Sequence, residues 1–429
     1  MPEPPGSLRD PTTPPTRGAA GTATVEVAAP RGAVGALVYC QAAYYATVGV
    51  DLTLTALVGL ALAPSPAWAT VPLATITATG AVASVATGLV AARLGYGRAM
   101  ALGALVGAAG GLVSVTAVLV QSFLLLCVGT GLVGVYRATG GYIRFVGADL
   151  AGPARRDRAI STILLGGLAA AFVGPWLATA SQDALPTRYA APFLVVTLLC
   201  LSTLPALAPV LRAERSRAGD RAGAPAHGAG AVALRDVEDR STLVLGALVL
   251  VSAAVLMTMI MAIGPLANQH AGHTTAAGAL MIQLHLVGMF APALFSGPLV
   301  ERLGARRVAV TGGLLFVAGA VVGSTGDGVA RFVAALAFNG VAWNLLFVAG
   351  TSLLASCYPP GRGGRVQALA EGAGNGASVL ASLSASAVLV TVGWHGANLF
   401  AAAAATVVTL LVVPATLRGR RTTPGEAGR

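Results

Sequence analysis

The stretches GLVAARLGYGR at residues 88–98 and GPLVERLGARR at residues 297–307 are two copies of one pattern. Each copy follows a long apolar run and ends in arginine. An internal repeat of this kind indicates two parallel halves, a recurrent plan among polytopic membrane proteins. Three positions of the pattern recur at a constant offset of 209 residues: Gly88 and Gly297, Arg93 and Arg302, and Gly95 and Gly304.

The composition around this repeat excludes a soluble globular protein. Of the 429 residues, 55% are hydrophobic and only 10% are charged, whereas a soluble domain carries about 25% charged residues. Apolar runs of about 20 residues recur along the whole chain, and each is long enough to cross a bilayer as a helix. The 55 glycines suit this class, because small residues let membrane helices approach closely. The predicted fold is therefore all-α, polytopic and membrane-embedded.

The apolar runs and the breaks between them predict twelve membrane-spanning helices in two bundles of six. The first bundle occupies residues 31–210 and the second 242–417, joined by a flexible cytoplasmic linker at 211–241. Residues 1–30 and 418–429 are expected to be disordered cytoplasmic tails. The predicted spans are 33–57, 69–92, 99–119, 122–147, 159–181, 190–210, 242–267, 276–299, 308–326, 329–356, 366–391 and 397–417.

The distribution of arginine predicts the orientation. All 27 basic residues are arginine, and 23 of them fall in segments that share one side of the membrane with both termini. The loops of the other side hold only Arg188 and Arg331. Basic residues accumulate on the cytoplasmic side of membrane proteins. The chain is therefore expected to lie in the cell membrane with both termini in the cytoplasm. The net charge of +11 belongs to these loops and does not indicate a nucleic-acid partner.

Asp51 and Arg137 lie deep inside predicted spans. A charge at the centre of a membrane helix costs roughly 2.5–3.5 kcal/mol on insertion scales, so it needs a wet cavity, a counter-ion or a substrate. Counted along their helices, the two charges lie within about 10 Å of each other in depth. Our hypothesis is that Asp51 binds a coupling proton and that Arg137 tunes its affinity. The alternative is a fixed ion pair that holds two helices together.

Polar residues align along single faces of several predicted spans, and such faces should point toward protein or water rather than lipid. The face of span 33–57 that carries Asp51 is one example. Arg144 has the alternative of extending to the aqueous surface, and a lone membrane histidine such as His285 is often a packing residue. The residues expected to line a substrate cavity are Tyr44, Thr47, Arg144, His285, Asn344 and Asn375.

The two copies of the repeat resemble the loop motif G-x-x-x-D-R-x-G-R-R of the major facilitator superfamily. In that family the motif joins helices two and three and again eight and nine, and its charges latch the inner gate. The second copy keeps the acid as Glu301, whereas the first copy has Ala92 in its place. The resemblance implies gating loops formed by Gly88, Arg93, Gly95 and Arg98 and by Gly297, Glu301, Arg302, Gly304 and Arg306.

Three shorter segments are similar to motifs of proton-coupled members of the same family. Gly174-Pro175 resembles the antiporter motif in which a Gly-Pro pair bends helix five, although Trp176 follows where small residues are usual. Arg137 with Gly141 resembles a helix-four segment linked to proton transfer. The segment that begins at Asp51 resembles the helix-one motif of drug–proton antiporters.

The resemblance implies a secondary active transporter of small organic molecules, working as a monomer by alternating access. The antiporter-like segments favour proton-coupled efflux. Import of a nutrient or vitamin-like compound, by symport or uniport, is the alternative, and a membrane sensor or scaffold without transport is a third. Sequence alone separates export from import poorly.

Catalytic and cofactor motifs are missing from the sequence. There is no H-E-x-x-H, and no G-x-S-x-G with a plausible partner residue. No lysine is present for a phosphate-binding loop or a Schiff base, and the four cysteines are isolated without metal-binding spacing. The sequence therefore predicts neither an enzyme nor a bound metal or cofactor.

Overall fold

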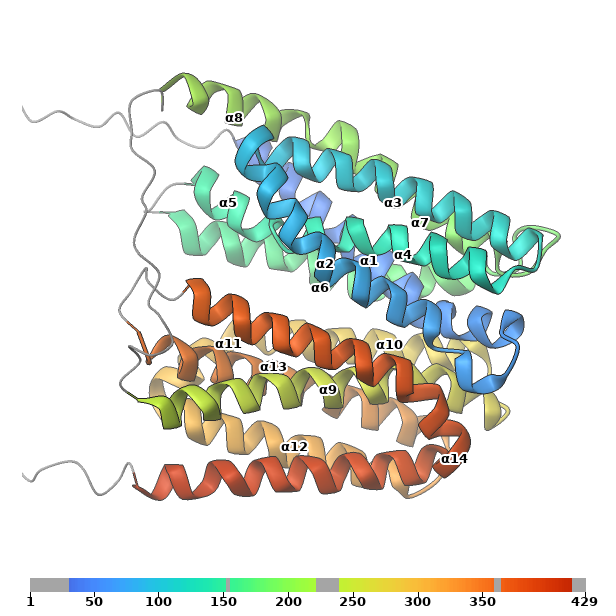
Figure 1. The fold of residues 1–429 in the computed structure, drawn as a ribbon, viewed down its shortest axis with the longest axis vertical. Coiled ribbons are helices and arrows are strands. Elements are labelled where there is room, and N and C mark those ends of the chain that lie inside the picture. Colours follow the sequence, from blue (N-terminus) through green and yellow to red (C-terminus); the bar gives the residue numbers. More distant parts are fainter. Residues whose placement is uncertain (1–30, 152–154, 221–238, 359–363, 419–429) are drawn as a thin grey trace, which may run out of the picture.

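A computed structural model describes residues 31–151, 155–220, 239–358 and 364–418 of the chain. These residues form helices and turns without a strand, arranged as two stacked bundles (Figure 1). Both ends of the described chain lie at the same end of the molecule, which we call the proximal end, and the opposite end is the distal end. The predicted tails at 1–30 and 419–429 and most of the predicted linker lie outside the described residues.

The N-terminal bundle begins with a long helix that runs from the proximal to the distal end. The helix α4 begins with a side-chain cap, since the Ser122 side chain accepts a hydrogen bond from the Leu125 N–H. The elements are α1 (Arg31–Leu62), the 3-10 turn η1 (Pro66–Trp68), α2 (Val71–Leu94), α3 (Tyr96–Leu119), α4 (Phe123–Gly140), α5 (Ile143–Ala151), α6 (Arg156–Ser181), α7 (Ala190–Ala206) and α8 (Ala208–Asp220).

The C-terminal bundle starts at Asp239, whose carboxylate accepts hydrogen bonds from the Thr242 N–H and hydroxyl and from the Ser241 hydroxyl. Thr274 caps the next helix in the same way. The hydrogen bonds from Thr242 and Ser241 favour the ionised form of the Asp239 carboxyl group and lower the pKa of Asp239 to about 2. The elements are α9 (Arg240–His270), α10 (Thr275–Phe290), α11 (Ala293–Leu303), α12 (Ala305–Ser324), α13 (Val329–Ala355) and α14 (Gly364–Arg418).

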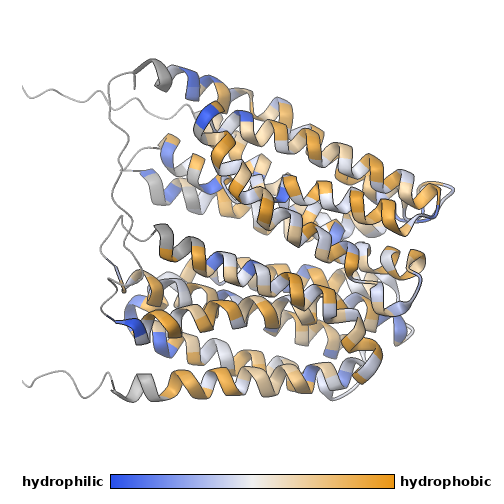
Figure 2. Cartoon of the chain, viewed as in Figure 1, coloured by the Kyte–Doolittle hydropathy of each residue, from blue (hydrophilic) through white to orange (hydrophobic). Residues whose placement is uncertain are grey.

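The fold class predicted from the sequence is confirmed. By length and apolar composition, the described residues contain ten helices able to cross a membrane, or eleven when the bent pair α10–α11 counts as one span. One of these, Leu369–Val413, contains two helices that meet at Gly393, where the backbone leaves the helical region. The arrangement agrees with twelve spans in two bundles, and most of the ribbon of these helices has the colour of hydrophobic residues (Figure 2).

Three segments differ from the predicted spans. The span expected at 122–147 ends as α4 at Gly140, and a short turn separates it from α5. The span expected at 276–299 bends by 44° between α10 and α11, where Pro292 lacks the N–H that would continue the helix. The linker expected from residue 211 begins as helix instead, because α8 continues to Asp220.

The internal repeat of the sequence is also a repeat of structure. The helix pairs α3–α4, α2–α4 and α1–α6 pack in the first bundle as α12–α13, α10–α13 and α9–α14 do in the second. The two copies of the loop pattern turn on equivalent glycines, Gly95 with a φ of +89° and Gly304 with a φ of +83°. Both glycines also have extended ψ angles, a combination essentially restricted to glycine.

Glycine contacts hold equivalent helices together in both bundles. A Cβ atom on Gly80 of α2 would lie 3.2 Å from the Gly134 carbonyl oxygen of α4, and one on Gly288 of α10 would lie 2.8 Å from the Ala337 carbonyl oxygen of α13. Lipid gives helices no hydrophobic reason to associate, so contacts this close supply the packing energy. The bundles therefore depend on small residues at matching positions.

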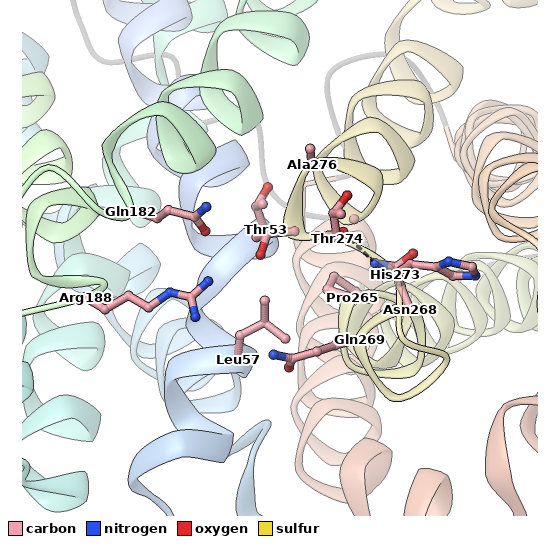
Figure 3. A pocket seen from close by; sticks show the side chains of 12 residues that line it. Thr53, Leu57, Gln182, Arg188, Pro265, Asn268, Gln269, His273, Thr274 and Ala276 are labelled. Carbon is pink, nitrogen blue, oxygen red and sulfur yellow. Dashed lines mark hydrogen bonds between the residues drawn. The ribbon is translucent and has the colours of Figure 1, made fainter.

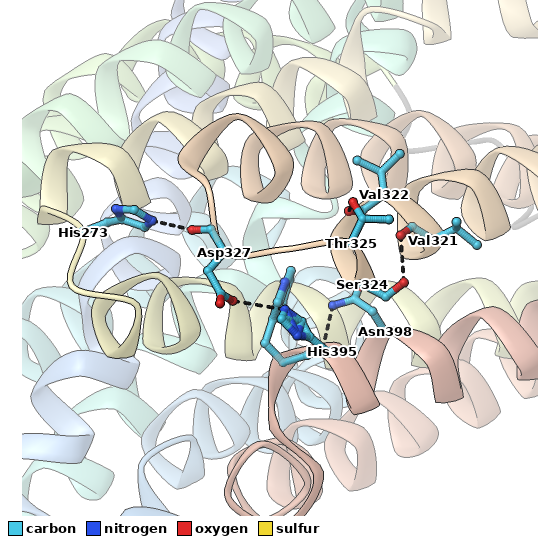
Figure 4. A network of polar contacts seen from close by, with 9 residues as sticks. His273, Val321, Val322, Ser324, Thr325, Asp327, His395 and Asn398 are labelled. Atoms are coloured by element: carbon cyan, nitrogen blue, oxygen red, sulfur yellow. Dashed lines mark hydrogen bonds and ion pairs between the residues drawn. The ribbon is translucent and has the colours of Figure 1, made fainter.

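The distal end of the C-terminal bundle carries a polar network on Asp327, between α12 and α13 (Figure 4). The His395 ring Nε2 lies 3.1 Å from its carboxylate, and the His273 ring Nε2 lies 2.5 Å from its backbone oxygen. His273 belongs to the α9–α10 loop, and His395 follows Gly393 in α14. The network therefore ties together three segments that are far apart in the sequence.

We predict that Gly304→Ala destabilises the protein by about 1–3 kcal/mol, because alanine cannot easily adopt this backbone conformation. No atom lies within 4 Å of the added methyl group, so the effect isolates the backbone. Thermal unfolding of the purified protein in detergent measures it. The matched control is Gly297→Ala, seven residues earlier in α11, where the space is equally open and the backbone is helical. Equal melting temperatures for the two variants would contradict the prediction.

Candidate functional site

Asp51 lies inside the N-terminal bundle. Its side chain projects from α1, and only 1% of the residue is exposed. Among the described residues no ion pair within 4 Å reaches the carboxylate and no hydrogen bond of good geometry reaches either of its oxygens, although the Thr55 hydroxyl is close enough to act on it. The charged group that acts on it electrostatically is Arg137 of α4, which is half-buried. The fixed ion pair considered from the sequence is therefore not formed in this conformation.

The hydroxyl of Thr55, one turn after Asp51 on α1, is also buried without a hydrogen bond of good geometry, and the group within its reach is the Asp51 carboxylate. The Tyr136 hydroxyl on α4, beside Arg137 in the sequence, is likewise buried without such a bond, and the Thr203 hydroxyl of α7 is within its reach. Buried polar groups are normally hydrogen-bonded, and exceptions gather at functional sites. We call Asp51, Thr55, Tyr136 and Arg137 the Asp51 group. Three of its members, Asp51, Thr55 and Tyr136, are buried in the first bundle without a hydrogen bond of good geometry, and the fourth, Arg137, acts on Asp51 by its charge.

Aromatic contacts connect this region with the second bundle. The Tyr44 ring lies 6.0 Å from that of Tyr136 and 4.7 Å from that of Tyr45, measured between centroids. The Tyr45 ring in turn lies 4.5 Å from that of Phe290 on α10. Gly140 makes room for this arrangement, because a Cβ atom there would overlap the Tyr44 ring. A continuous chain of rings thus runs from α4 through α1 to the C-terminal bundle.

Hydrogen bonds join the bundles directly near the distal end. Thr70, just before α2, and Ser386 of α14 are both buried, and their hydroxyl oxygens are 2.6 Å apart. The Thr70 N–H donates to the Ser386 hydroxyl at 2.8 Å, and the Ser386 N–H donates back at 3.3 Å. We call this pair the distal clasp. Deeper in the structure, the Gln283 amide donates to the Phe172 carbonyl oxygen at 3.1 Å.

Several residues expected to line one cavity have separate places. Thr47 is buried and donates to the Tyr44 carbonyl oxygen of its own helix. His285 is buried inside the C-terminal bundle, where its Nδ1 lies 3.0 Å from the Leu336 carbonyl oxygen of α13. Asn344 of α13 donates to the Met289 carbonyl oxygen of α10 at 2.8 Å. His285 and Asn344 each use one polar atom to hold α10 against α13, whereas the His285 Nε2 and the Asn344 Oδ1 have no partner among the described residues, so their place in a substrate cavity stays a prediction.

The remaining predicted cavity residues belong to three different helices. Tyr44 is half-buried next to the Asp51 group, as its ring contact with Tyr136 shows. Arg144 lies on α5 beyond the turn that ends α4, and Asn375 lies on an exposed face of α14. The structure brings Tyr44, Asp51 and Arg137 into one region, and Arg144 acts electrostatically on Tyr45 beside them. The common cavity of all the predicted residues stays a prediction.

The loops of the repeat contact residues that flank the linker. The Glu214 carboxylate of α8 accepts hydrogen bonds from the Gly97 N–H at 3.0 and 3.1 Å, beside the first loop. In the second loop, Arg306 donates to the Thr242 hydroxyl at 3.0 Å, next to Asp239. The first loop, which lacks the acid of the motif at Ala92, thus meets an acid from α8. A negative charge at a helix N-terminus is favourable, so Glu214 stabilises the start of α3.

Gly174 and Pro175 form the contact between α6 and α1. A Cβ atom on Gly174 would lie 2.6 Å from the Ala46 carbonyl oxygen, and one on Gly49 would lie 2.7 Å from the Pro175 Cδ. α6 continues through this pair as one helix from Arg156 to Ser181. The pair therefore makes a close approach of two helices, and the bend expected there stays a prediction.

Sequence reasoning missed Thr70, Ser386 and the Tyr45–Phe290 contact. Threonine and serine are common in membrane spans and usually bond to their own helix, as Thr53 does with Gly49. No local pattern distinguishes the two residues that bond across bundles. Tyr136 was detectable, because it adjoins Arg137 in an apolar span.

We predict that Ser386→Ala weakens the distal clasp by about 1–3 kcal/mol, because the buried Thr70 N–H loses its acceptor. With spin labels at Ala184 and Thr325, in distal turns of the two bundles, the distance between the labels can be measured. Ser386→Ala should show a larger fraction of long distances than the protein with Ser386. The control is Ser384→Ala on the same helix, where the exposed hydroxyl bonds only to carbonyls of its own helix. The same distance distribution in both variants would contradict the prediction.

Comparisons with known proteins agree with this architecture. A family model described as Major Facilitator Superfamily matches residues 247–429. The chain is 32% identical over 383 residues to the riboflavin transporter RfnT of Brucella anthropi, covering 89% of this chain and 94% of that protein. It is 26% identical over 395 residues to YddS of Bacillus subtilis, an uncharacterized MFS-type transporter, with 88% of each covered.

Solved structures share the fold at low sequence identity. The human organic anion transporter MFSD10 (TETRAN) superposes with a TM-score of 0.64 at 16% identity, covering 89% of this chain and 99% of that one. The nucleoside transporter NupG superposes with a TM-score of 0.66 at 12% identity, covering 89% and 98%. The relative that is similar along almost the whole chain, the family model and the twin bundles together show that this chain belongs to the major facilitator superfamily, as a multi-pass transporter of small molecules.

Proposed function

We propose that this transporter carries a riboflavin-like vitamin into the cell. The observation that carries the proposal is the 32% identity to a riboflavin transporter, which extends over 89% of the chain and so includes both bundles. This relative favours the importer over the efflux antiporter suggested by the helix-one and helix-five motifs. The proximal end is then cytoplasmic, as the arginine-rich segments on that side support.

We propose proton coupling through Asp51. A carboxyl group that is buried in apolar surroundings without a counter-ion is most stable in its neutral, protonated form. Arg137 is near enough to act on it without pairing. A movement of α1 against α4 that brought the two side chains together would favour release of the proton. Tyr44 connects this movement with the second bundle through Tyr45 and Phe290.

Alternating access then consists of rocking of the two bundles. In the conformation described, the distal clasp joins α14 to the segment that begins α2. Opening toward the distal side requires Thr70 and Ser386 to separate. Each residue bonds to the other with both its backbone N–H and its side chain, so the clasp can break and re-form as a unit.

Proton-coupled efflux is the second candidate. The observation in its favour is the tight contact of Gly174 and Pro175 with α1 at Gly49, two residues before Asp51. Movement of α6 would therefore act directly on the helix that holds the carboxylate. The same contact is compatible with import, so the direction has to be measured.

We predict that proteoliposomes containing the protein accumulate riboflavin against its gradient when protons flow in the same direction. Asp51→Asn should abolish this uphill uptake and leave downhill exchange, because asparagine is neutral in both states. Flavin fluorescence and internal pH, followed together, measure both fluxes. The control is Asp149→Asn, an exposed acid on α5 outside the bundle interior.

Three outcomes separate the possibilities. Riboflavin uptake that drives no proton movement would contradict coupling and leave facilitated diffusion. Full uphill uptake in Asp51→Asn would move the coupling site elsewhere. Accumulation only when the imposed proton gradient opposes riboflavin flow would establish the antiporter and overturn the proposed import.

A further inference from the structure

A cavity of about 360 Å³ lies between the two bundles at the distal end (Figure 3). α1 contributes Thr53 and Leu57, and the α6–α7 connection contributes Gln182 and Arg188. The other wall consists of residues 265–278, at the end of α9 and the start of α10. A volume of this size lies at the lower end of the range for small-molecule sites. Because both bundles supply its walls, the cavity changes shape when they move.

The cavity is separate from the Asp51 group although both involve α1. Thr53 and Asp51 are two residues apart, so their side chains leave the helix roughly 200° apart. Thr53 lines the space between the bundles, whereas Asp51 lies inside the first bundle, where the charge of Arg137 acts on it. A ligand in the cavity would therefore not touch the Asp51 carboxylate.

The walls offer hydrogen-bond acceptors that the protein does not use. Asn268 is 1% exposed, and its amide nitrogen donates to the Thr274 carbonyl oxygen while its Oδ1 has no partner. The Oε1 of Gln182 on the opposite wall is likewise buried without a partner. The Thr53 hydroxyl donates to the Gly49 carbonyl oxygen, which leaves its lone pairs free to accept. Such acceptors are satisfied by a ligand that brings O–H or N–H groups.

The charges at the cavity favour an uncharged ligand. Arg188 points into it from the first bundle (Figure 3), but its Nε lies 3.2 Å from the Asp183 carboxylate. Its guanidinium carbon also lies 4.8 Å from the centroid of the Tyr189 ring. This ion pair is solvent-exposed and holds the guanidinium only weakly, but it places a carboxylate beside the cation and balances its charge. The remaining polar side chains of the wall are amides, hydroxyls and the His273 imidazole.

We propose that this distal cavity is a second binding site, which takes up an uncharged small molecule rich in hydroxyl or N–H donors, of the polyol type, before it reaches the centre of the protein. Asn268 and Gln182 accept hydrogen bonds from its donors, one from each bundle. Binding there requires both walls, so the ligand is held only while the bundles approach each other at this end. The inference rests on the proposed function only in the choice of riboflavin, whose ribityl chain is a polyol, as the first probe.

The first test measures binding of riboflavin and of lumiflavin, the flavin ring without the ribityl chain, to the full-length protein in lipid nanodiscs by flavin fluorescence. Asn268→Leu and Gln182→Met remove one acceptor each at similar size. Each should weaken riboflavin binding roughly tenfold, which corresponds to about 1.4 kcal/mol, and leave lumiflavin binding unchanged. The control is Asn398→Leu, since Asn398 is equally buried, has an equally unpartnered Oδ1 and lies in α14 away from the cavity.

The second test does not depend on riboflavin. A cysteine introduced as Ala276→Cys, at an exposed position of the cavity wall, is labelled with a membrane-impermeant maleimide in the presence of ribitol. Labelling of Ala276→Cys should be slower with ribitol than without it. Ribitol should not change the rate of labelling of Val120→Cys, an exposed distal position outside the cavity.

The two tests separate the two proposals. If the wild-type protein binds no riboflavin but ribitol protects Ala276→Cys, the vitamin proposal fails and the cavity proposal stands. If riboflavin binds with the same affinity to Asn268→Leu, Gln182→Met and Asn398→Leu, and ribitol protects nothing, the cavity proposal is overturned and the vitamin proposal stands.

Discussion

Close approach between helices is the constraint on which this structure depends. Lipid is as apolar as the side chains it surrounds, so helices gain little by hiding hydrophobic groups from it and must hold together by contact. Glycine makes that contact possible where α1 meets α6 at Gly49 and Gly174, and where α2 meets α4 at Gly80 and Gly134. Larger residues there would separate the backbones.

The two bundles use this common packing for different chemistry. The helix pair α1–α6 touches through glycine and proline, whereas the equivalent pair α9–α14 touches through a hydrogen bond of 3.2 Å between the hydroxyls of Thr258 and Ser378. In the first bundle the Asp51 carboxyl group lies buried beside these contacts without an ion pair among the described residues. In the second, the buried His285 has its Nδ1 3.0 Å from the Leu336 carbonyl oxygen and its Nε2 without a partner among the described residues. The two halves thus share the scaffold and differ in the titratable group that each one buries, a carboxyl group in the first and an imidazole in the second.

The transport proposals rely on elements that join the halves rather than on either half. The ring contact of Tyr45 with Phe290 and the distal clasp are made by residues from both bundles. Each would be altered by a rotation of one bundle against the other. The distal cavity has the same property, because its unpaired acceptors at Gln182 and Asn268 lie on opposite walls. Events at the ligand site and at Asp51 can therefore be linked through α1.

The sequence by itself determined the membrane class, the approximate place of most spans, the duplication and the burial of Asp51, because hydropathy, helix breakers and the cost of a buried charge act locally along the chain. It also located Gly95 and Gly304, where one loop pattern requires one backbone conformation. Only the tertiary structure decided that His285 and Asn344 join α10 to α13, that α4 stops at Gly140, and that Thr70 meets Ser386. These outcomes depend on which helices become neighbours and at what rotation, and residues more than 300 positions apart leave no local signal of their contact.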